Sequence, residues 1–137
     1  MTVSVFDYLP EEASVIRDTV FIKEQGFEYE FDDIDLKASH LVAYDNGIPI
    51  GTCRVFLDGQ RFVLGRLAVL KECRGKKAGA FLLSAAERLV AEKGGKELFL
   101  HAQTRVKVFY EKQGFEAFGE IDFDEDCPHI WMKKAVK

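Results

Sequence analysis

The sequence has little cysteine and no long hydrophobic run, and each scarcity excludes a class of protein. Its three cysteines, Cys53, Cys73 and Cys127, are odd in number and lack the spacing of metal ligands, which favours free thiols over a disulfide framework. No apolar stretch is long enough to cross a membrane, and the N-terminus lacks a basic segment followed by an apolar one. We therefore expect a cytoplasmic protein with no membrane association and no metal site.

An excess of positive charge is also absent. The 19 Lys and Arg residues are outnumbered by 23 Asp and Glu residues, which gives a formal net charge of −4. This balance argues against a nucleic-acid partner, because such binding usually relies on a broad basic face. The chain also lacks repeats and linkers, and its 137 residues, 47% of them hydrophobic, suffice for a buried core. We expect one domain over residues 1–137.

Nine of the 23 acidic residues fall in two clusters, residues 28–35 and residues 122–126. One interpretation is that both clusters are solvated loops. The other is that they surround the mouth of a site and attract a cationic substrate such as an amine. The sequence leaves both open.

Hydrophobic periodicity predicts an α+β fold. Residues 2–8 alternate, with Val3 and Val5 expected to face inward, and Pro10 opens a helix that runs to about residue 26. The Asn46-Gly47 pair between two β-type runs is a strong hairpin signal. The other predicted elements are strands at 40–44, 48–57, 62–70, 97–103, 114–120 and 129–133, and helices at 78–93 and around 106–110. We expect a mixed, mostly antiparallel sheet with helices on both faces, in which strand 97–103 runs parallel to strand 62–70.

The most informative segment is a basic turn between strand 62–70 and helix 78–93. The backbone N–H groups at a helix start lack partners, and the helix dipole adds partial positive charge there. Glycines within the turn leave room for a ligand to approach the backbone. The segment reads Arg74-Gly75-Lys76-Lys77-Ala78-Gly79-Ala80. We expect it to bind a phosphate-bearing cofactor.

Two segments together resemble the GNAT superfamily of acetyl-CoA-dependent N-acetyltransferases. Leu67-Ala68-Val69 followed by the basic turn resembles the family's strand and pyrophosphate loop. Residues 109–115, Phe-Tyr-Glu-Lys-Gln-Gly-Phe, resemble the family's C-terminal Tyr-Glu-Lys-x-Gly-Phe motif. Residues 20–25, 40–43, 65–69 and 102–103 further resemble the ElaA-like or YjcF-like bacterial branch.

The resemblance implies a cofactor, acetyl-CoA, and the residues that hold it. Leu67, Ala68 and Val69 would offer backbone groups to the pantetheine arm and the acetyl carbonyl, and the basic turn would bind the pyrophosphate. Gln103, Phe109 and Tyr110 would complete the cofactor site. Three positions depart from the family pattern: Lys77 replaces a glycine, Gln103 an asparagine and Val106 an alanine. Because the loop uses mainly backbone N–H groups, we expect Lys77 to serve with an ordinary helical backbone.

Tyr110 matches the family tyrosine that donates a proton to the departing thiolate. A thiol of pKa near ~8.5 is a fair leaving group but gains from a phenol donor of pKa about 10. The alternative is that Tyr110 is an aromatic residue that packs its helix on the sheet.

The general base is harder to assign. Many relatives use a glutamate on the strand before the loop, but Leu64-Gly65-Arg66 offers none here. We select Glu24 as the catalytic base, with His40, His101 and His129 as other candidates, although each of these residues can equally be structural. Arg66, His40 and His101 are the predicted substrate-binding residues, and Arg66 can instead pair with a nearby acidic residue.

These observations predict an N-acetyltransferase that moves acetyl to a primary amine of a small molecule or a protein. The missing strand glutamate motivates an alternative, a non-catalytic regulatory module that binds acetyl-CoA. Dimers are common among similar proteins, so a homodimer stays open, although no residue indicates an interface.

Overall fold

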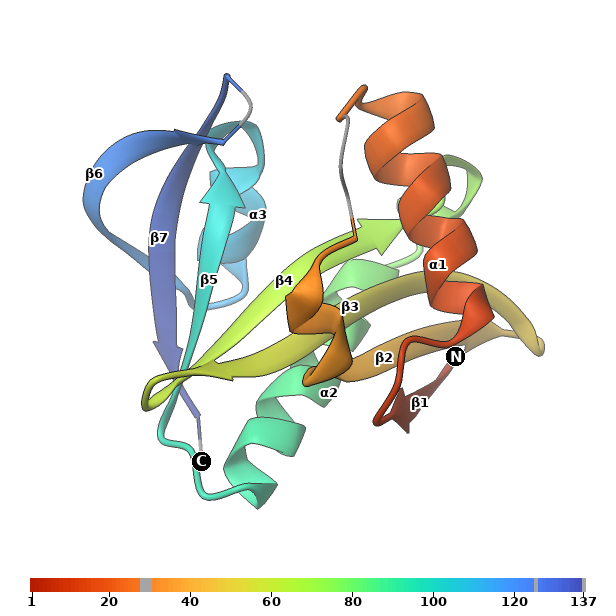
Figure 1. Cartoon of the computed structure of the whole chain (residues 1–137), viewed down its shortest axis with the longest axis horizontal. Helices are drawn as coiled ribbons and strands as arrows, with labels where there is room; N and C mark the ends of the chain where they lie inside the picture. The colour runs from red at the N-terminus through yellow and green to blue at the C-terminus, as the bar shows by residue number, and fades with distance from the viewer. Residues whose placement is uncertain (28–30, 125, 137) are drawn as a thin grey trace.

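The computed structural model describes residues 1–27, 31–124 and 126–136. All of its strands join one seven-stranded sheet in the order β1-β2-β3-β4-β5-β7-β6 (Figure 1). The strands are β1 (Thr2–Phe6), β2 (Ser39–Asp45), β3 (Ile48–Asp58), β4 (Arg61–Val69), β5 (Glu97–Gln103), β6 (Glu116–Asp124) and β7 (Cys127–Ala135). Every pairing is antiparallel except β4 with β5, which is parallel. The predicted mixed, mostly antiparallel sheet is confirmed.

Helices cover both faces of this sheet, as the sequence predicted. Helix α1 (Glu11–Arg17) continues into a π-helical segment, η1 (Asp18–Glu24), on one face, and α2 (Ala78–Glu92) lies on the other (Figure 1). Helix α3 (Lys107–Lys112) follows β5 after the 3₁₀ turn η4 (Thr104–Val106). Two further 3₁₀ turns are η2 (Asp33–Leu36) and η3 (Lys71–Cys73). None of these helices in the described part of the chain combines the length and apolar character that a membrane crossing needs.

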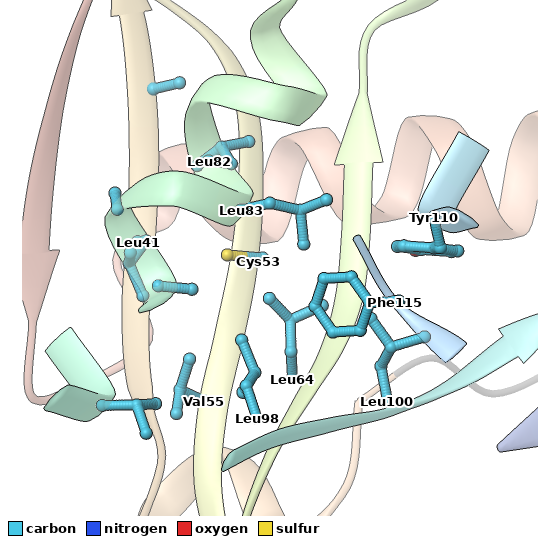
Figure 2. Packing of buried hydrophobic residues seen from close by; sticks show 14 of the residues in the cluster. Leu41, Cys53, Val55, Leu64, Leu82, Leu83, Leu98, Leu100, Tyr110 and Phe115 are labelled. Atoms are coloured by element: carbon cyan, nitrogen blue, oxygen red, sulfur yellow. The ribbon is translucent and has the colours of Figure 1, made fainter. Parts of the chain in front are cut away.

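The main hydrophobic core lies between α2 and the sheet. Figure 2 shows Leu82 and Leu83 of α2 among side chains of β2 to β5. Tyr110 and Phe115 extend this core beside Leu100. A smaller cluster of Ile16, Val20, Phe21 and Ala68 holds α1 and η1 against the other face. One detail of the predicted pattern is wrong: Val5 is 52% exposed, because β1 is an edge strand and its own face is only partly covered.

An irregularity in β4 separates the end of that strand from β5. Between the pairs Arg54↔Gly65 and Thr52↔Ala68, β3 has one residue and β4 has two, so β4 contains a bulge. Arg66 takes a left-handed backbone there, with φ of 51°. Strands β4 and β5 pair only over Phe62–Leu64 and then diverge (Figure 1). The bulge therefore opens the sheet between the C-terminal ends of its two parallel strands.

Buried ion pairs fasten the segment before β2 to the α1 face of the sheet. Asp35 accepts hydrogen bonds from Arg17 of α1 at 2.9 and 2.8 Å and from Arg54 of β3 at 2.9 Å. Asp32 accepts from the same Arg54 at 2.6 Å and from Arg66 at 3.3 Å. These two acidic residues of the cluster 28–35 are therefore structural ion-pair partners, while residues 28–30 lie outside the described residues.

Candidate active site

The divergence of β4 and β5 opens into a cavity of ≈ 800 Å³. Its walls are the ends of β4 and β5, the turn before α2, helix α3 and the segment from η1 to Phe27. A cavity of this size is typical of small-molecule and cofactor sites. Of the residues that the sequence assigned to cofactor, substrate or catalysis, all but Lys76, Glu24 and His40 line it.

The edge of β4 that faces this cavity has free hydrogen-bonding capacity. Beyond Leu64, no strand of the described chain pairs with that edge, so the backbone groups of residues 67–69 on this side have no ladder partner. One of them is partly used, because the Val69 carbonyl accepts a bond from Arg74 Nε at 3.0 Å. Leu67, Ala68 and Val69 all line the cavity on this edge.

The turn before α2 has the backbone of an anion cradle. Gly75 has φ of 86°, and the first amide of the helix to bond within it is Phe81 N–H, which donates to Lys77 O at 3.0 Å. The N–H groups that precede it therefore have no acceptor within the helix. Lys77, however, does not have the helical backbone that we expected. Its φ of 67° and ψ of 19° are left-handed, which explains why glycine suits this position in the family.

Helix α3 closes over the start of α2 through an aromatic contact. A Cβ added at Gly79 would lie 3.1 Å from Phe109 Cζ, so the absence of a side chain at Gly79 allows this close approach. Phe109 in turn packs edge-on against Tyr110, with ring centroids 5.2 Å apart. Lys76 is exposed and does not line the cavity.

Tyr110 is a buried side chain that also reaches the cavity. It is 8% exposed, packs against Phe115 and belongs to the main core (Figure 2). Burial raises the pKa of Tyr110 well above 10, so the phenol is fully protonated at neutral pH. The two interpretations of Tyr110 are therefore compatible, because one side chain packs α3 and presents a hydroxyl donor.

Glu24 is held by Arg74 at the mouth of the cradle. Arg74 donates to both carboxylate oxygens, at 2.7 and 2.8 Å, and this hydrogen bonding lowers the pKa of Glu24 below its ordinary value. Glu24 lines an adjacent cavity of ≈ 870 Å³ rather than the one between β4 and β5. A carboxylate that is paired, less basic and turned away from the cavity is poorly suited to accept a proton from an amine.

Arg66 and His40 differ in how they relate to the cavity. Arg66 lines it and pairs with Asp32, which was one of the two roles expected for it. His40 is fully buried under η2, where its Nε2 donates to the carbonyl of Asp35 at 3.0 Å. Burial lowers the pKa of His40, which favours a neutral ring. The structure does not bring His40 to the cavity, because its strand position faces the ion-pair cluster.

Gln103 and His101 project from the end of β5 toward the η1 side of the opening. Gln103 donates to Gln25 at 3.0 Å and accepts from Arg105 at 2.8 Å, so it links β5 to the end of η1. His101 donates from Nε2 to Asp122 at 2.6 Å. Its ring also stacks on His129 at 4.7 Å and on Trp131 at 4.9 Å.

Several residues of the cavity wall were not predicted from the sequence. Phe21 and Phe27 form an apolar wall opposite β4, and their rings meet edge-on at 6.5 Å. Phe21 belongs to the segment 20–25 that resembles the ElaA-like or YjcF-like branch, but the sequence assigned neither phenylalanine to the site. Over the described residues, no group of three or more His, Cys, Asp or Glu side chains is arranged to hold a metal ion.

Comparison with known proteins defines the family. Residues 6–136 match the model of the acetyltransferase (GNAT) domain, so the chain belongs to the GNAT acetyltransferase family. It is 34% identical over 127 residues to the N-acetyltransferase YjcF of Bacillus subtilis, covering 90% of this chain and 91% of the relative.

Solved structures agree with this assignment. The crystal structure of Escherichia coli ElaA superposes with a TM-score of 0.84 at 27% identity, over 98% of this chain and 99% of ElaA. An acyl-CoA N-acyltransferase from Pseudomonas aeruginosa gives 0.85 at 25% identity, over 98% and 99%. The chain is thus a GNAT acetyltransferase of the ElaA- and YjcF-like branch, and the acyl donor of this class is acetyl-CoA.

Proposed function

We propose that the chain transfers acetyl to a primary amine of a small molecule or a protein by direct attack in the cavity between β4 and β5. The observation that carries the proposal is that three features line the same cavity. These are an unpaired β4 edge, a cradle of unpaired N–H groups before α2 and a buried phenol on α3. When bound, acetyl-CoA supplies a thioester whose carbonyl carbon accepts the amine nitrogen and whose sulfur leaves.

The residues present fit such a donor. The turn 74–80 would hold the pyrophosphate, because its free amides and the start of α2 favour an anion. Backbone N–H groups of β4 would stabilise negative charge on the acyl oxygen as the amine adds. Phe21 and Phe27 close the opposite side and exclude water from the reacting groups.

Tyr110 is the proposed general acid. Since burial raises the pKa of its hydroxyl, Tyr110 keeps its proton until negative charge develops on sulfur, and the hydroxyl then donates to that atom. Removal of the hydroxyl alone should therefore slow the transfer and leave binding of the donor nearly unchanged.

The test compares the wild type with Tyr110→Phe. Thiol release from acetyl-CoA is followed with a panel of primary amines, and donor affinity is measured by calorimetry. We expect turnover to fall by about 10²-fold or more, in line with the loss of a general acid, while affinity changes little. Equal turnover of the two proteins at every pH would remove Tyr110 from the chemistry.

One observation favours a second function, a non-catalytic module that binds acetyl-CoA. No carboxylate of β4 lies at the site, and Glu24 is committed to Arg74. This alternative predicts donor binding without thiol release for any amine in the panel, together with a protein partner whose binding depends on acetyl-CoA.

A further inference from the structure

The cavity contains a buried imidazole whose second nitrogen is uncommitted. His129 of β7 is 6% exposed and lines the opening between β4 and β5. Its Nδ1 lies 2.8 Å from the carbonyl oxygen of Cys127. Because a carbonyl can only accept, Nδ1 must carry the proton, and the neutral ring then has a bare lone pair on Nε2. Among the described residues, none forms a hydrogen bond with that nitrogen.

Two of the other basic groups suggested by the sequence do not reach this cavity. Glu24 is bound at both oxygens by Arg74 and faces the adjacent cavity. His40 is buried away from the opening. His101 also lines the opening and donates from Nε2 to Asp122, which leaves a lone pair on its Nδ1, so the test must tell the two rings apart.

We propose that His129 is the general base of the transfer, accepting through Nε2 the proton that the amine loses as it attacks. This inference rests on the proposed function, because it assigns a residue to that reaction. The sheet positions the ring: His129 pairs with Gln103 of β5 and with Asp122 of β6. Stacking on His101 at 4.7 Å further fixes the plane of the ring.

The step needs such a group because a neutral amine that adds to a carbonyl carbon becomes positively charged and must lose a proton. Only the neutral form of the amine attacks. With a pKa of about 10.4, roughly one amine in a thousand is neutral near pH 7.4. In the proposed step the neutral nitrogen bonds to the acetyl carbon, its proton passes to Nε2 and the carbon–sulfur bond breaks. The sulfur takes its proton from the Tyr110 hydroxyl. Water returns a proton to Tyr110 and receives the one on His129.

The charged and titratable groups near the ring come from three strands and one 3₁₀ turn. They are Arg66 on β4, His101 on β5, Asp122 and Asp124 on β6, and Arg105 after β5. Because positively and negatively charged groups both lie near the ring, the residue that causes a change of activity with pH must be identified by substitution.

The test uses His129→Asn and His129→Gln. Asparagine keeps an amide donor near the position of Nδ1 and so can still bind the Cys127 carbonyl, but it has nothing at the position of Nε2. Glutamine places a polar, non-basic amide near that position. For each protein, kcat/KM per neutral amine is measured against pH. In the wild type we expect it to rise with pH as the general base loses its proton. Both variants should lose that rise and fall by about 10²–10⁴-fold.

The outcomes separate this inference from the proposed function. Thiol release by the wild type with an unchanged pH rise in His129→Asn overturns the role of His129 alone. A rise that is lost in His101→Gln but kept in His129→Asn assigns the base to His101 and equally overturns it. Absence of thiol release by the wild type with every amine overturns both proposals.

A second readout is independent of activity. Proton–nitrogen correlation spectra of the histidine rings in the wild type, without acetyl-CoA, report which nitrogen carries the proton. The signals that disappear in His129→Asn identify this ring. We expect a protonated Nδ1 and a bare Nε2, and a neutral ring protonated on Nε2 would contradict the proposal.

Discussion

The buried carboxylate of Asp35 should be the most costly polar side chain to remove. It accepts three charged hydrogen bonds, from Arg17 at 2.9 and 2.8 Å and from Arg54 at 2.9 Å. Those two arginines are 1% and 3% exposed. The substitution Asp35→Asn preserves the shape of the side chain but removes the negative charge between them.

The magnitude follows from what the substitution leaves behind. Breaking a buried ion pair by neutralising one partner typically costs 3–5 kcal/mol, because the remaining charge stays buried. Asp32 still pairs with Arg54 at 2.6 Å, so we expect the lower end of that range, about 3 kcal/mol. Such a loss is a large fraction of the stability of an ordinary domain.

The pH dependence gives a second estimate. Burial alone would raise the pKa of Asp35, but the hydrogen bonds and charges of Arg17 and Arg54 outweigh it and lower the pKa from 3.8 to about 2. A folded pKa below the unfolded one stabilises the protein above pH 3.8 and is lost as the pH falls toward 2. The difference between the folded and unfolded pKa values corresponds to about 2 kcal/mol of folding stability.

Urea denaturation of the wild type, Asp35→Asn and the control Asp33→Asn is the assay. Asp33 is an exposed residue of the same turn, so its substitution should change the free energy of unfolding by less than about 0.5 kcal/mol. The gap between the wild type and Asp35→Asn should narrow between pH 4 and pH 2. A loss below about 1 kcal/mol at pH 7, or an equal loss in the control, would refute this account of the cluster.

Two further predictions concern the cradle. Lys77→Gly should relieve a left-handed backbone and stabilise the fold by about 0.5–1 kcal/mol, whereas Lys76→Gly, at a position without a positive φ, should destabilise it. Thermal unfolding measures both effects, and a loss of stability in Lys77→Gly would contradict the strain at Lys77. Glu24→Gln should release Arg74 for phosphate and tighten coenzyme A binding roughly fivefold by calorimetry, given about 1 kcal/mol for a charge near the surface. Weaker binding would instead show that Glu24 holds Arg74 in its productive position.

The parts of the fold that local chemistry determines could be predicted. Asn46 and Gly47 have φ of 53° and 79°, as the tight hairpin demanded, and β4, α2 and β5 form the expected parallel crossover. The apolar stripe of α2 likewise indicated the side that packs on the sheet.

The parts of the fold that depend on residues far apart in the sequence could not be predicted. Glu24 and Arg74 are 50 positions apart, and Asp35 lies 18 and 19 positions from its two arginines. The sequence does not indicate which acidic residue binds which arginine, because ion pairs do not recur at a fixed spacing along the chain. The left-handed backbone of Arg66 was equally hidden, since only glycine ordinarily signals such a backbone, whereas at Lys77 the glycine of the family pattern was a signal. Arg66, Arg74 and Lys77 line the cavity between β4 and β5, and Glu24 lines the cavity next to it.

The most direct test of the central claim is a calorimetric titration of acetyl-CoA into the wild type and into Gly79→Glu. A side chain at Gly79 would meet Phe109 Cζ at 3.1 Å and would bring a carboxylate to the cradle that is proposed to hold the pyrophosphate. Thermal unfolding of both proteins shows whether the variant is folded. We predict micromolar binding by the wild type that is lost in a folded Gly79→Glu. Equal binding by both proteins, or no binding by the wild type, would contradict the account.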